Sequence, residues 1–319
     1  MPFSKLASIV LGDKGSIDVI IVSADILPMK TGKYTKYTVQ DTTGTSSAVM
    51  DFDNKAAVCN AKAGDIVTLS FVASPYKGGM SLHVTSMAQC SRSPEEFIRN
   101  STMDMGTAKA QLRNYVNKIN NQLLKELVSN MIFNNIERFA KAPAASGVHH
   151  NWVGGLLEHT LSLLSMVSAV HTQYIYYFPK LDSDFIYAGI LIHDWGKILE
   201  LNHRTPAFDY TEEGNLIGHI SLCVREIYRA SDELKKEIYY DSTIVQHLVH
   251  IVLSHHGKKE WGSSITPMTP EAVLVHQLDL VDSSMMKMYG VIEKTFSGGM
   301  TSKDIDGNRY KRVPILGRE

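Results

Sequence analysis

The first third of the chain alternates hydrophobic and polar residues, as half-buried β-strands do. Branched and aromatic residues are concentrated in five segments, 16–27, 33–41, 46–52, 65–76 and 80–89, with turn-forming residues between them. Five short strands in so few residues predict a small closed barrel. The OB-fold is the most common barrel with this strand count, and a small sandwich is the competing architecture.

From Thr107 onward the apolar residues recur at three- and four-residue spacing, which predicts helices. One helix is predicted over 123–142 and ends at Pro143. The others are predicted over 153–177, 184–199, 218–230, 232–254 (interrupted) and 270–295. We therefore expect a barrel domain at 1–92, a polar linker at 93–106, an all-α domain at 107–300 and a basic tail at 301–319.

Composition limits the classes of protein that fit. The 319 residues are 44% hydrophobic and 20% charged, with a net charge of −1, so attraction to nucleic acid must come from a local basic patch. Three distant cysteines without a CxxC pair argue against a disulfide framework and a thiolate zinc site. No secretion signal or long apolar run is present, so we expect a cytoplasmic protein without membrane spans.

Histidines and aspartates are placed along the helical half as ligands of a metal centre would be. Of the 13 histidines, only His83 precedes residue 149. The candidate ligands fall at helix ends or on helix faces, and they are His159, His193, Asp194, His219, His255, His256 and Asp279. Imidazole with carboxylate suits manganese, iron, nickel, cobalt or zinc better than calcium. Seven ligands suit two ions better than one, with Asp194 as the bridging carboxylate.

Other residues of the helical half have a functional and a structural interpretation. Lys197 ends the HDWGK motif and is predicted to neutralise charge on a phosphate, against the alternative of a solvated lysine. Glu158 and Asp282 are either hydrogen-bond partners of ligands or surface charges. The remaining histidines are competing ligands (His247, His250), loop residues that face a substrate (His149, His150), or structural residues (His171, His203, His276).

Cations and aromatic rings are interleaved in the predicted barrel and follow one predicted ligand pair. This combination holds single-stranded nucleic acid without reading its sequence. The predicted contacts are Lys33, Tyr34, Lys36, Tyr37, Tyr76 and Lys77 in the barrel, with Lys258, Lys259 and Trp261 near the metal centre. The alternative for each is an exposed lysine or a core aromatic residue.

The ordered ligand pattern resembles that of HD-domain metal-dependent phosphohydrolases. The segments GGLLEHT, LIHDWGK, TEEGNLIGHI, LSHHGKKEWGS and VHQLDLVD are further similar to the YhaM-type 3′-to-5′ exoribonucleases. The resemblance covers nearly the whole chain and is strongest over residues 149–290. It departs at Trp195, where a small aliphatic residue is common. It implies an OB-fold barrel followed by an HD-domain helical bundle, and manganese as the preferred ion, with magnesium also possible.

Three functions follow from these patterns. The first is a metal-dependent 3′-to-5′ exonuclease that removes nucleoside 5′-monophosphates from single-stranded RNA or, as the alternative, single-stranded DNA, with Asp194 and Lys197 as catalytic residues. The second is an HD phosphohydrolase of small nucleotides such as a dNTP or a cyclic dinucleotide. The third is a non-catalytic single-strand-binding module. Oligomeric state stays open, and a homo-oligomer is compatible with all three.

Overall fold

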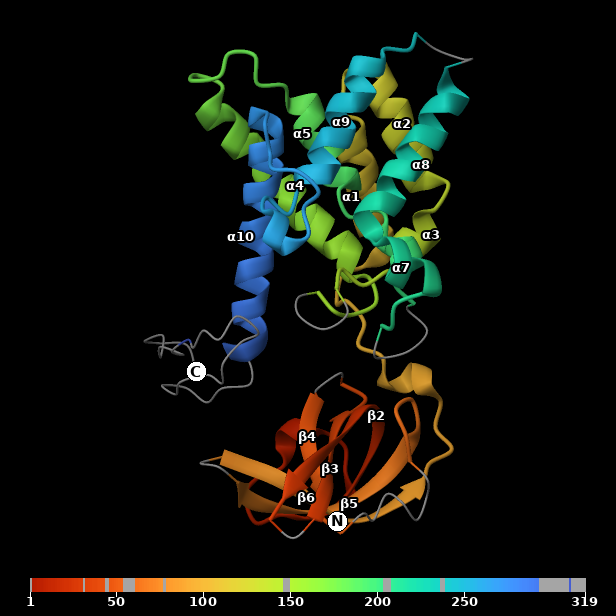
Figure 1. Ribbon diagram of the computed structural model, residues 1–319, viewed down its shortest axis with the longest axis vertical. Helices are drawn as coiled ribbons and strands as arrows, with labels where there is room; N and C mark the ends of the chain where they lie inside the picture. Colours follow the sequence, from red (N-terminus) through yellow and green to blue (C-terminus); the bar gives the residue numbers. More distant parts are fainter. Residues whose placement is uncertain are drawn as a thin grey trace. The chain divides into compact units, whose positions relative to one another are not determined.

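The computed structural model describes residues 2–30, 32–43, 46–53, 61–76, 79–145, 150–202, 208–235, 239–292 and 310. The chain divides into two compact units, with the division after Asn100. The first unit is built from strands and the second from helices (Figure 1). The predicted order of an all-β domain followed by an all-α domain is therefore confirmed.

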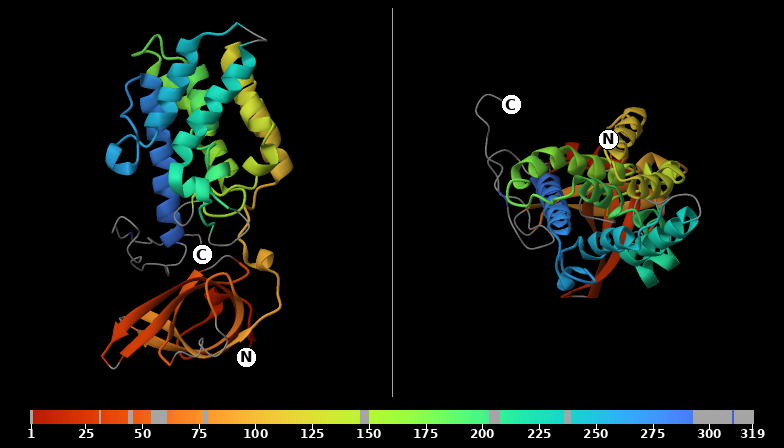
Figure 2. Two further views of the ribbon diagram at one scale, coloured as in Figure 1. Left: turned by 45° about the vertical axis from the view of Figure 1, so that its right-hand side comes forward. Right: turned by 90° about the horizontal axis from the view of Figure 1, so that it is seen from above.

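The first unit contains the five predicted strands and a short additional one. The strands are β1 (Pro2–Phe3), β2 (Lys14–Met29), β3 (Gly32–Gln40), β4 (Ser46–Asp51), β5 (Ile66–Tyr76) and β6 (Gly79–Gln89). The long β2 pairs with β3 through its second half and with β5 through its first half. This double pairing closes the sheet into the barrel visible in Figure 2.

Strand order identifies the barrel as an OB-fold. Around the barrel the order is β2, β3, β4, β6, β5 and back to β2, with antiparallel neighbours except for β4 and β6. In the parallel pair, Val49 lies opposite Leu82. A five-stranded Greek-key barrel of this kind is the OB-fold, so the competing sandwich is excluded. Its interior is filled by alternate residues of the strands, including the fully buried Val19, Val39 and Val67.

The segment predicted to be a linker is partly folded. Pro94–Phe97 forms a short 3₁₀ helix, in which the Ser93 backbone N–H donates to the Glu96 carboxylate over 3.0 Å. Phe97 is fully buried against Ile20 and Ile66 of the barrel. The polar composition of this segment does not predict its contact with the barrel, because Phe97 alone makes the apolar packing.

The second unit is a helical bundle (Figures 1 and 2). Its helices are α1 (Met105–Val116), α2 (Gln122–Phe133), α3 (Ile136–Phe139), α4 (Gly155–Tyr174), α5 (Ser183–Ile192), α6 (Lys197–Glu200), α7 (Glu212–Ile217), α8 (His219–Leu234), α9 (Ser242–Ser254) and α10 (Pro270–Ile292). Helix α5 is apolar on all sides and packs against α2, α4, α9 and α10. None of these helices is long and apolar enough to cross a membrane.

Two helices predicted as continuous are interrupted. The helix expected over 123–142 breaks at Asn134–Asn135, between α2 and α3. The helix expected over 184–199 ends at Ile192, and the chain turns through His193–Gly196 before α6. Apolar periodicity continues through both breaks because the residues beyond them are also buried. The second break releases His193 and Asp194 from the end of the central helix.

Candidate metal centre

Helices α4, α5, α8, α9 and α10 each bring predicted ligand residues to the turn after α5. His193 and Asp194 follow the buried end of α5, His219 begins α8, and His255 follows α9. The turn lies close to α8 because Gly196 has no side chain. A Cβ atom at Gly196 would lie 2.0 Å from the carbonyl oxygen of His219, which no packing change relieves cheaply.

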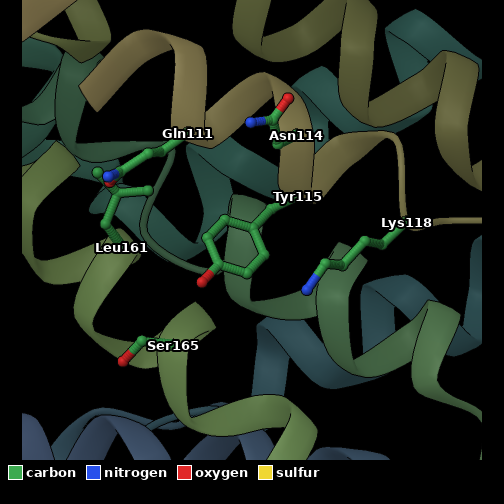
Figure 3. Close-up of a pocket in the computed structure, with 6 residues that line it drawn as sticks. All are labelled: Gln111, Asn114, Tyr115, Lys118, Leu161 and Ser165. Atoms are coloured by element: carbon green, nitrogen blue, oxygen red, sulfur yellow. The ribbon is translucent and has the colours of Figure 1, made fainter. Parts of the chain in front are cut away.

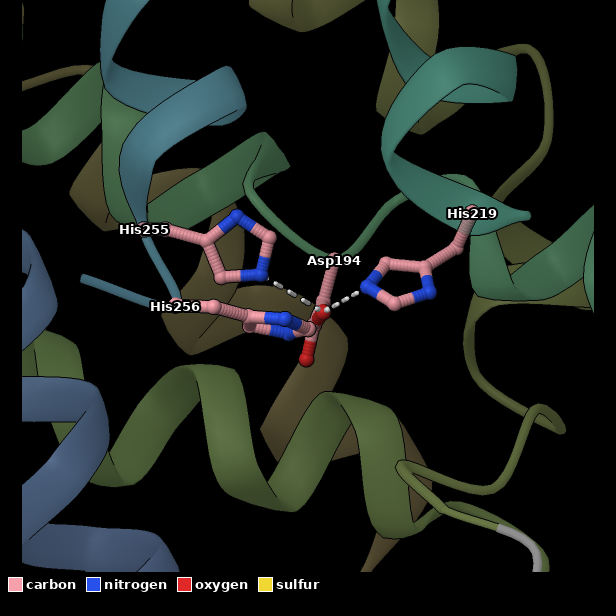
Figure 4. A group of neighbouring side chains, drawn as sticks. All are labelled: Asp194, His219, His255 and His256. Atoms are coloured by element: carbon pink, nitrogen blue, oxygen red, sulfur yellow. Dashed lines mark ion pairs between the residues drawn. The ribbon is translucent and has the colours of Figure 1, made fainter. Parts of the chain in front are cut away.

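Asp194 lies at the middle of this group, and its two carboxylate oxygens have different neighbours. Oδ1 lies 3.5 Å from Nε2 of His219 and 3.5 Å from Nε2 of His255 (Figure 4). Oδ2 lies 3.4 Å from Nε2 of His193 and 2.6 Å from Nζ of Lys197. A carboxylate placed in this way can bridge two cations, one at each oxygen.

The other three predicted ligands complete the two sides. On the Oδ2 side, His159 Nε2 lies 3.3 Å from His193 Nε2 and 3.4 Å from Asp279 Oδ1. On the Oδ1 side, the His256 ring lies beside those of His255 and His219, with centroid distances of 4.2 and 5.3 Å. The structure thus brings all seven predicted ligand residues close together. Six of them form two groups with metal-binding geometry that share Asp194, one with His219, His255 and His256 and the other with His159 and His193. Asp279 joins them through its contact with His159.

Each imidazole in the cluster is oriented through its Nδ1 atom. Three rings donate from Nδ1–H to a backbone carbonyl oxygen: His193 to Ile190, His255 to Val252, and His256 to Trp261. The other two donate to a carboxylate: His159 to Asp282, and His219 to Glu200. These bonds are 2.7–3.0 Å long. They fix the orientation of each ring and leave Nε2, rather than Nδ1, as the atom that could bind a metal ion.

Three atoms at the centre are buried with no hydrogen-bond partner in the described part of the chain. They are Oδ1 of Asp194, Nε2 of His219 and Nε2 of His255. An unsatisfied buried polar atom costs about 1–3 kcal/mol, so three on one side are expensive unless a ligand satisfies them. One carboxylate oxygen and two imidazole nitrogens are ligands that a divalent transition metal accepts. The residues present therefore fit a metal ion.

Charges around Asp194 keep it ionised. Burial would raise the pKa of its carboxyl, but Lys197 and His193 outweigh this and hold the pKa well below the ordinary value. Burial would likewise lower the pKa of His159, but hydrogen bonds to Asp279 and Asp282 raise it to about 9. Burial lowers the pKa of His256 to about 3, with a further contribution from His255. The two sides therefore differ in protonation as well as in position.

The partners that orient the ligands were only partly predicted. Asp282 is confirmed, because its Oδ2 accepts from His159 Nδ1 over 2.8 Å. The prediction that Glu158 orients a ligand was wrong, because its carboxylate accepts hydrogen bonds from Ser101 and Trp152 instead of from a ligand histidine. Glu200 was missed, although it accepts both the backbone N–H and the Nδ1–H of His219. Its signal is a buried glutamate one turn after Lys197, which sequence alone does not separate from a surface glutamate.

Histidines outside the cluster have other partners. Nε2 of His247 contacts Thr269, and Nε2 of His250 accepts from the Met268 backbone, so neither competes for the centre. His150 is buried and contacts Asp282 with Nε2 over 3.0 Å, which makes it part of the surroundings of His159. The structural interpretation fits His171 and His276, which contact backbone carbonyls. His149 and His203 lie outside the described residues.

The loop after His256 is tied to the centre through its backbone. Nδ1 of His256 donates to the carbonyl oxygen of Trp261 over 2.9 Å. The Trp261 side chain is 49% exposed, and Lys258 Nζ lies 4.5 Å from its ring centroid. Lys259 is exposed in the same loop. An exposed indole and two exposed lysines thus belong to a loop whose backbone is bonded to a ligand residue.

In the barrel, the two described tyrosines that were predicted to contact nucleic acid are buried. Tyr37 is 5% exposed and packs in the barrel core, and Tyr34 is 8% exposed with its ring 5.0 Å from that of Phe52. Neither ring has a free face for a base, so the core interpretation holds for both. Lys33 is exposed and Lys36 half-buried on β3. Lys77 and the Tyr76 side chain lie outside the described residues.

A separate surface cavity of about 440 Å³ lies between α1 and α4 (Figure 3). It is lined by Gln111, Asn114, Tyr115, Lys118, Leu161 and Ser165. Lys118 Nζ lies 4.7 Å from the ring centroid of Tyr115, which occupies one face of that ring. None of the seven predicted ligands lines this cavity, so it is distinct from the candidate metal centre.

Comparison with known protein families identifies a domain within the helical unit. Residues 156–284 match the HD domain family, and this range contains all seven predicted ligands. The barrel is similar to the second OB-fold domain of replication protein A from Methanococcus maripaludis, at 21% identity over 29% of this chain and 98% of that chain, with a TM-score of 0.23. The chain therefore contains an HD domain, the domain of metal-dependent phosphohydrolases, after an OB-fold barrel.

Proposed function

We propose that this protein is a metal-dependent 3′-to-5′ exonuclease of single-stranded RNA, with single-stranded DNA as the alternative substrate. The observation that carries the proposal is Asp194, which directs one oxygen to each of two groups of ligand atoms. Two ions held in this way suit hydrolysis of a phosphate diester. An OB-fold in the same chain supports a polymeric substrate, because this fold is a common single-strand platform.

The ligand residues divide into two sets that share Asp194. His219, His255 and His256 would hold one ion, and His159, His193 and Asp279 the other. When bound, the ions supply positive charge to the scissile phosphate and activate water at neutral pH. Imidazole with carboxylate suits manganese, iron, cobalt, nickel or zinc, and the resemblance to the YhaM-type exoribonucleases implies manganese among these.

Lys197 contributes a fixed positive charge. Burial would lower its pKa, but the carboxylate of Asp194 outweighs this and raises it, so the ammonium group stays protonated. Its position 2.6 Å from Asp194 Oδ2 holds it within the centre, where it can neutralise a non-bridging phosphate oxygen. Water then adds across the P–O3′ bond, releasing a nucleoside 5′-monophosphate and leaving a 3′-hydroxyl on the shortened strand.

The loop with Trp261 offers a contact for the end of the strand. Its indole can stack on a base, and Lys258 and Lys259 can pair with phosphates. The hydrogen bond from His256 to the Trp261 carbonyl joins the backbone of this loop to a ligand residue. We propose these three residues as the strand contacts of the helical unit, with Lys33 and Lys36 as those of the barrel.

A time course with 5′-labelled single-stranded RNA and DNA oligomers tests the proposal. We expect a ladder that shortens from the 3′ end with manganese, and no cleavage with chelator or in Asp194→Ala. Asp232→Asn is the matched control, because Asp232 is exposed on α8 and distant in sequence from the ligands. Intact oligomers under every condition would contradict the exonuclease.

The burial of Tyr34 and Tyr37 favours a second candidate, a phosphohydrolase of small nucleotides. Without those rings the barrel offers fewer stacking surfaces for a strand. Release of phosphate, pyrophosphate or a linear dinucleotide from dNTPs or cyclic dinucleotides, with intact oligomers, would establish this function instead. Binding of oligomers without any turnover would leave the non-catalytic module.

A further inference from the structure

The outward face of α10 lacks charge. Among the described side chains of this helix, seven are exposed, and they are Pro270, Val273, Gln277, Val281, Ser284, Met285 and Tyr289. The acidic residues of α10 point inward, since Glu271 and Asp282 are buried and Asp279 is 16% exposed. A long surface helix normally carries charged residues on its solvent side. Helix α10 instead has no charged residue among its described exposed side chains, and its one lysine, Lys287, is half-buried.

Helix α8 shows the ordinary arrangement in the same unit. Its exposed residues are Ser221, Arg225, Tyr228, Arg229, Asp232 and Glu233, so four of six are charged. Arg225 and Arg229 form ion pairs along the helix, including contacts with Glu226 at 3.0 and 3.4 Å. The two helices belong to one compact unit, so composition of the unit does not explain the difference. The face of α10 needs an explanation of its own.

Exposed uncharged side chains, four of them apolar, form one ridge along α10. Val273, Val281, Met285 and Tyr289 expose 43%, 49%, 55% and 45% of their surfaces, and Gln277 completes the four-residue spacing. Residues four apart lie one above another on a helix. Ridges of this spacing are the ones that most commonly pack against another helix. The exposed surface is therefore shaped for a helical partner.

The absence of charge on the exposed face of α10 favours a partner surface that is also uncharged. Nucleic acid would need cations to neutralise phosphates, and a charged peptide would need the opposite charge on this face. A neutral ridge meets a copy of itself without repulsion, which is the condition for a two-fold interface. We propose that the ridge of α10 packs antiparallel against the same ridge of a second copy of this chain, with the two-fold axis at Val281.

Exposed aromatic residues beside the start of α10 enlarge this surface. Tyr174, Tyr176, Tyr177 and Phe178 are 43–82% exposed at the end of α4. The segment that follows them is fixed to α10, because the Asp182 backbone N–H donates to Glu271 over 3.0 Å. A specific interface buries about 800 Å² per partner, more than a ridge one helix wide supplies. Aromatic residues, which bury about 150–250 Å² each, supply the remainder.

Sedimentation velocity of the full chain between about 1 and 100 μM tests the interface. We expect a dimer that dissociates on dilution, and at least a tenfold higher dissociation constant in Val281→Glu, because two carboxylates would face each other at the axis. Tyr228→Glu is the matched control, since Tyr228 is 44% exposed on α8 and lies outside the ridge. Its dissociation constant should stay within about twofold of the unchanged chain.

Cross-linking keeps the test informative if Val281→Glu folds poorly. In a chain with Cys59 and Cys90 changed to Ser, Val281→Cys should link to its own copy through a short bismaleimide. Val273→Cys should not, because it lies about 12 Å from the axis and its two copies about 24 Å apart. Three results would overturn the proposal: a monomer at 100 μM, an assembly unchanged in Val281→Glu, or equal cross-linking at both positions.

Discussion

The two sides of Asp194 differ in what the chain itself already supplies. On the Oδ2 side, Lys197 lies 2.6 Å away and His159 has a pKa raised to about 9. On the Oδ1 side, the oxygen and Nε2 of both His219 and His255 are buried without a hydrogen bond in the described chain. On the Oδ2 side, the negative charge of Asp194 is thus balanced by the Lys197 ammonium group and the protonated His159. On the Oδ1 side, the ligand atoms have no such partner and can accept a cation.

This difference predicts the order in which ions bind. A cation on the Oδ1 side satisfies three buried atoms and displaces nothing. A cation on the Oδ2 side must compete with the charge of Lys197 and remove a proton from His159. We therefore expect two phases in a metal titration, with the tighter phase on the Oδ1 side.

Removing Asp194 should have the largest effect, because it belongs to both sides. We expect Asp194→Asn to lose both titration phases and at least about 10³-fold in kcat, since the shared carboxylate is gone. Asp194→Ala should also lose about 3–5 kcal/mol of stability, because it leaves the Lys197 ammonium buried without its partner. Calorimetric titration with manganese, steady-state kinetics and urea unfolding measure these quantities.

A variant that keeps either phase intact would show that Asp194 does not join the two sides. Asp232→Asn serves as the control for removal of a carboxylate. Among the described residues, the exposed Asp232 pairs with Lys235 at the end of α8, so its loss should change stability by less than about 1 kcal/mol.

Replacing Lys197 separates charge neutralisation from metal binding. In Lys197→Met we expect kcat to fall about 10²–10³-fold, because the phosphate loses a fixed cation. The weaker titration phase should become tighter at the same time, since Oδ2 no longer pairs with an ammonium group. The tighter phase should stay unchanged. Weakening of both phases would mean that Lys197 only maintains the fold of the centre.

Sequence specified the centre better than it specified the barrel surface. Ligand residues such as His193 and Asp194 are recognisable because their chemistry and spacing leave few alternatives, and the structure brings them together. Tyr34 and Tyr37 fit two interpretations equally well, since an aromatic residue on a strand suits the core and the surface alike. They lie three residues apart on β3 and so point to opposite faces, which alternation would read as one buried and one exposed ring. Tyr37 packs in the barrel core, whereas Tyr34 lies against Phe52, a contact that the folded chain alone reveals.

The partners of the ligands were harder to predict than the ligands. Asp282 follows Asp279 by three residues and so shares its helix face, which made it accessible to sequence reasoning. Glu200 reaches His219 only because the chain turns after α5 and returns through α7. The broken helix at His193–Gly196 was missed for the same reason, since buried apolar residues continue on both sides of the turn. Contacts made across such a turn require the folded chain.

Glu200 and Asp282 form a matched pair, one for each side of the centre. Each accepts a hydrogen bond from Nδ1 of a ligand histidine, over 3.0 Å to His219 and 2.8 Å to His159. We expect Glu200→Gln to weaken the tighter phase about 10–100-fold and Asp282→Asn to weaken only the other, the usual size of such effects. Manganese titration of both variants measures this, and equal loss in both phases would contradict two separate sides.

The smallest effect expected concerns protons. Burial lowers the pKa of His159, but Asp279 and Asp282 outweigh it, so in the metal-free protein the pKa is about 9 against an ordinary 6.5. A raised folded-state pKa contributes stability that is complete below pH 6.5 and is lost as the pH rises through 9. Metal at Nε2 needs the neutral ring. The weaker phase should therefore release up to one proton at pH 7–8 and tighten by at most about tenfold per pH unit up to pH 9.

Calorimetry in buffers of different ionisation enthalpy counts these protons directly. The tighter phase provides the internal control, because burial lowers the pKa of His255 and His256 and both rings are already neutral at pH 7. That phase should release no proton from them. Equal proton release in the two phases would mean that the protonated His159 does not distinguish the sides, and the predicted order of binding would then rest on Lys197 alone.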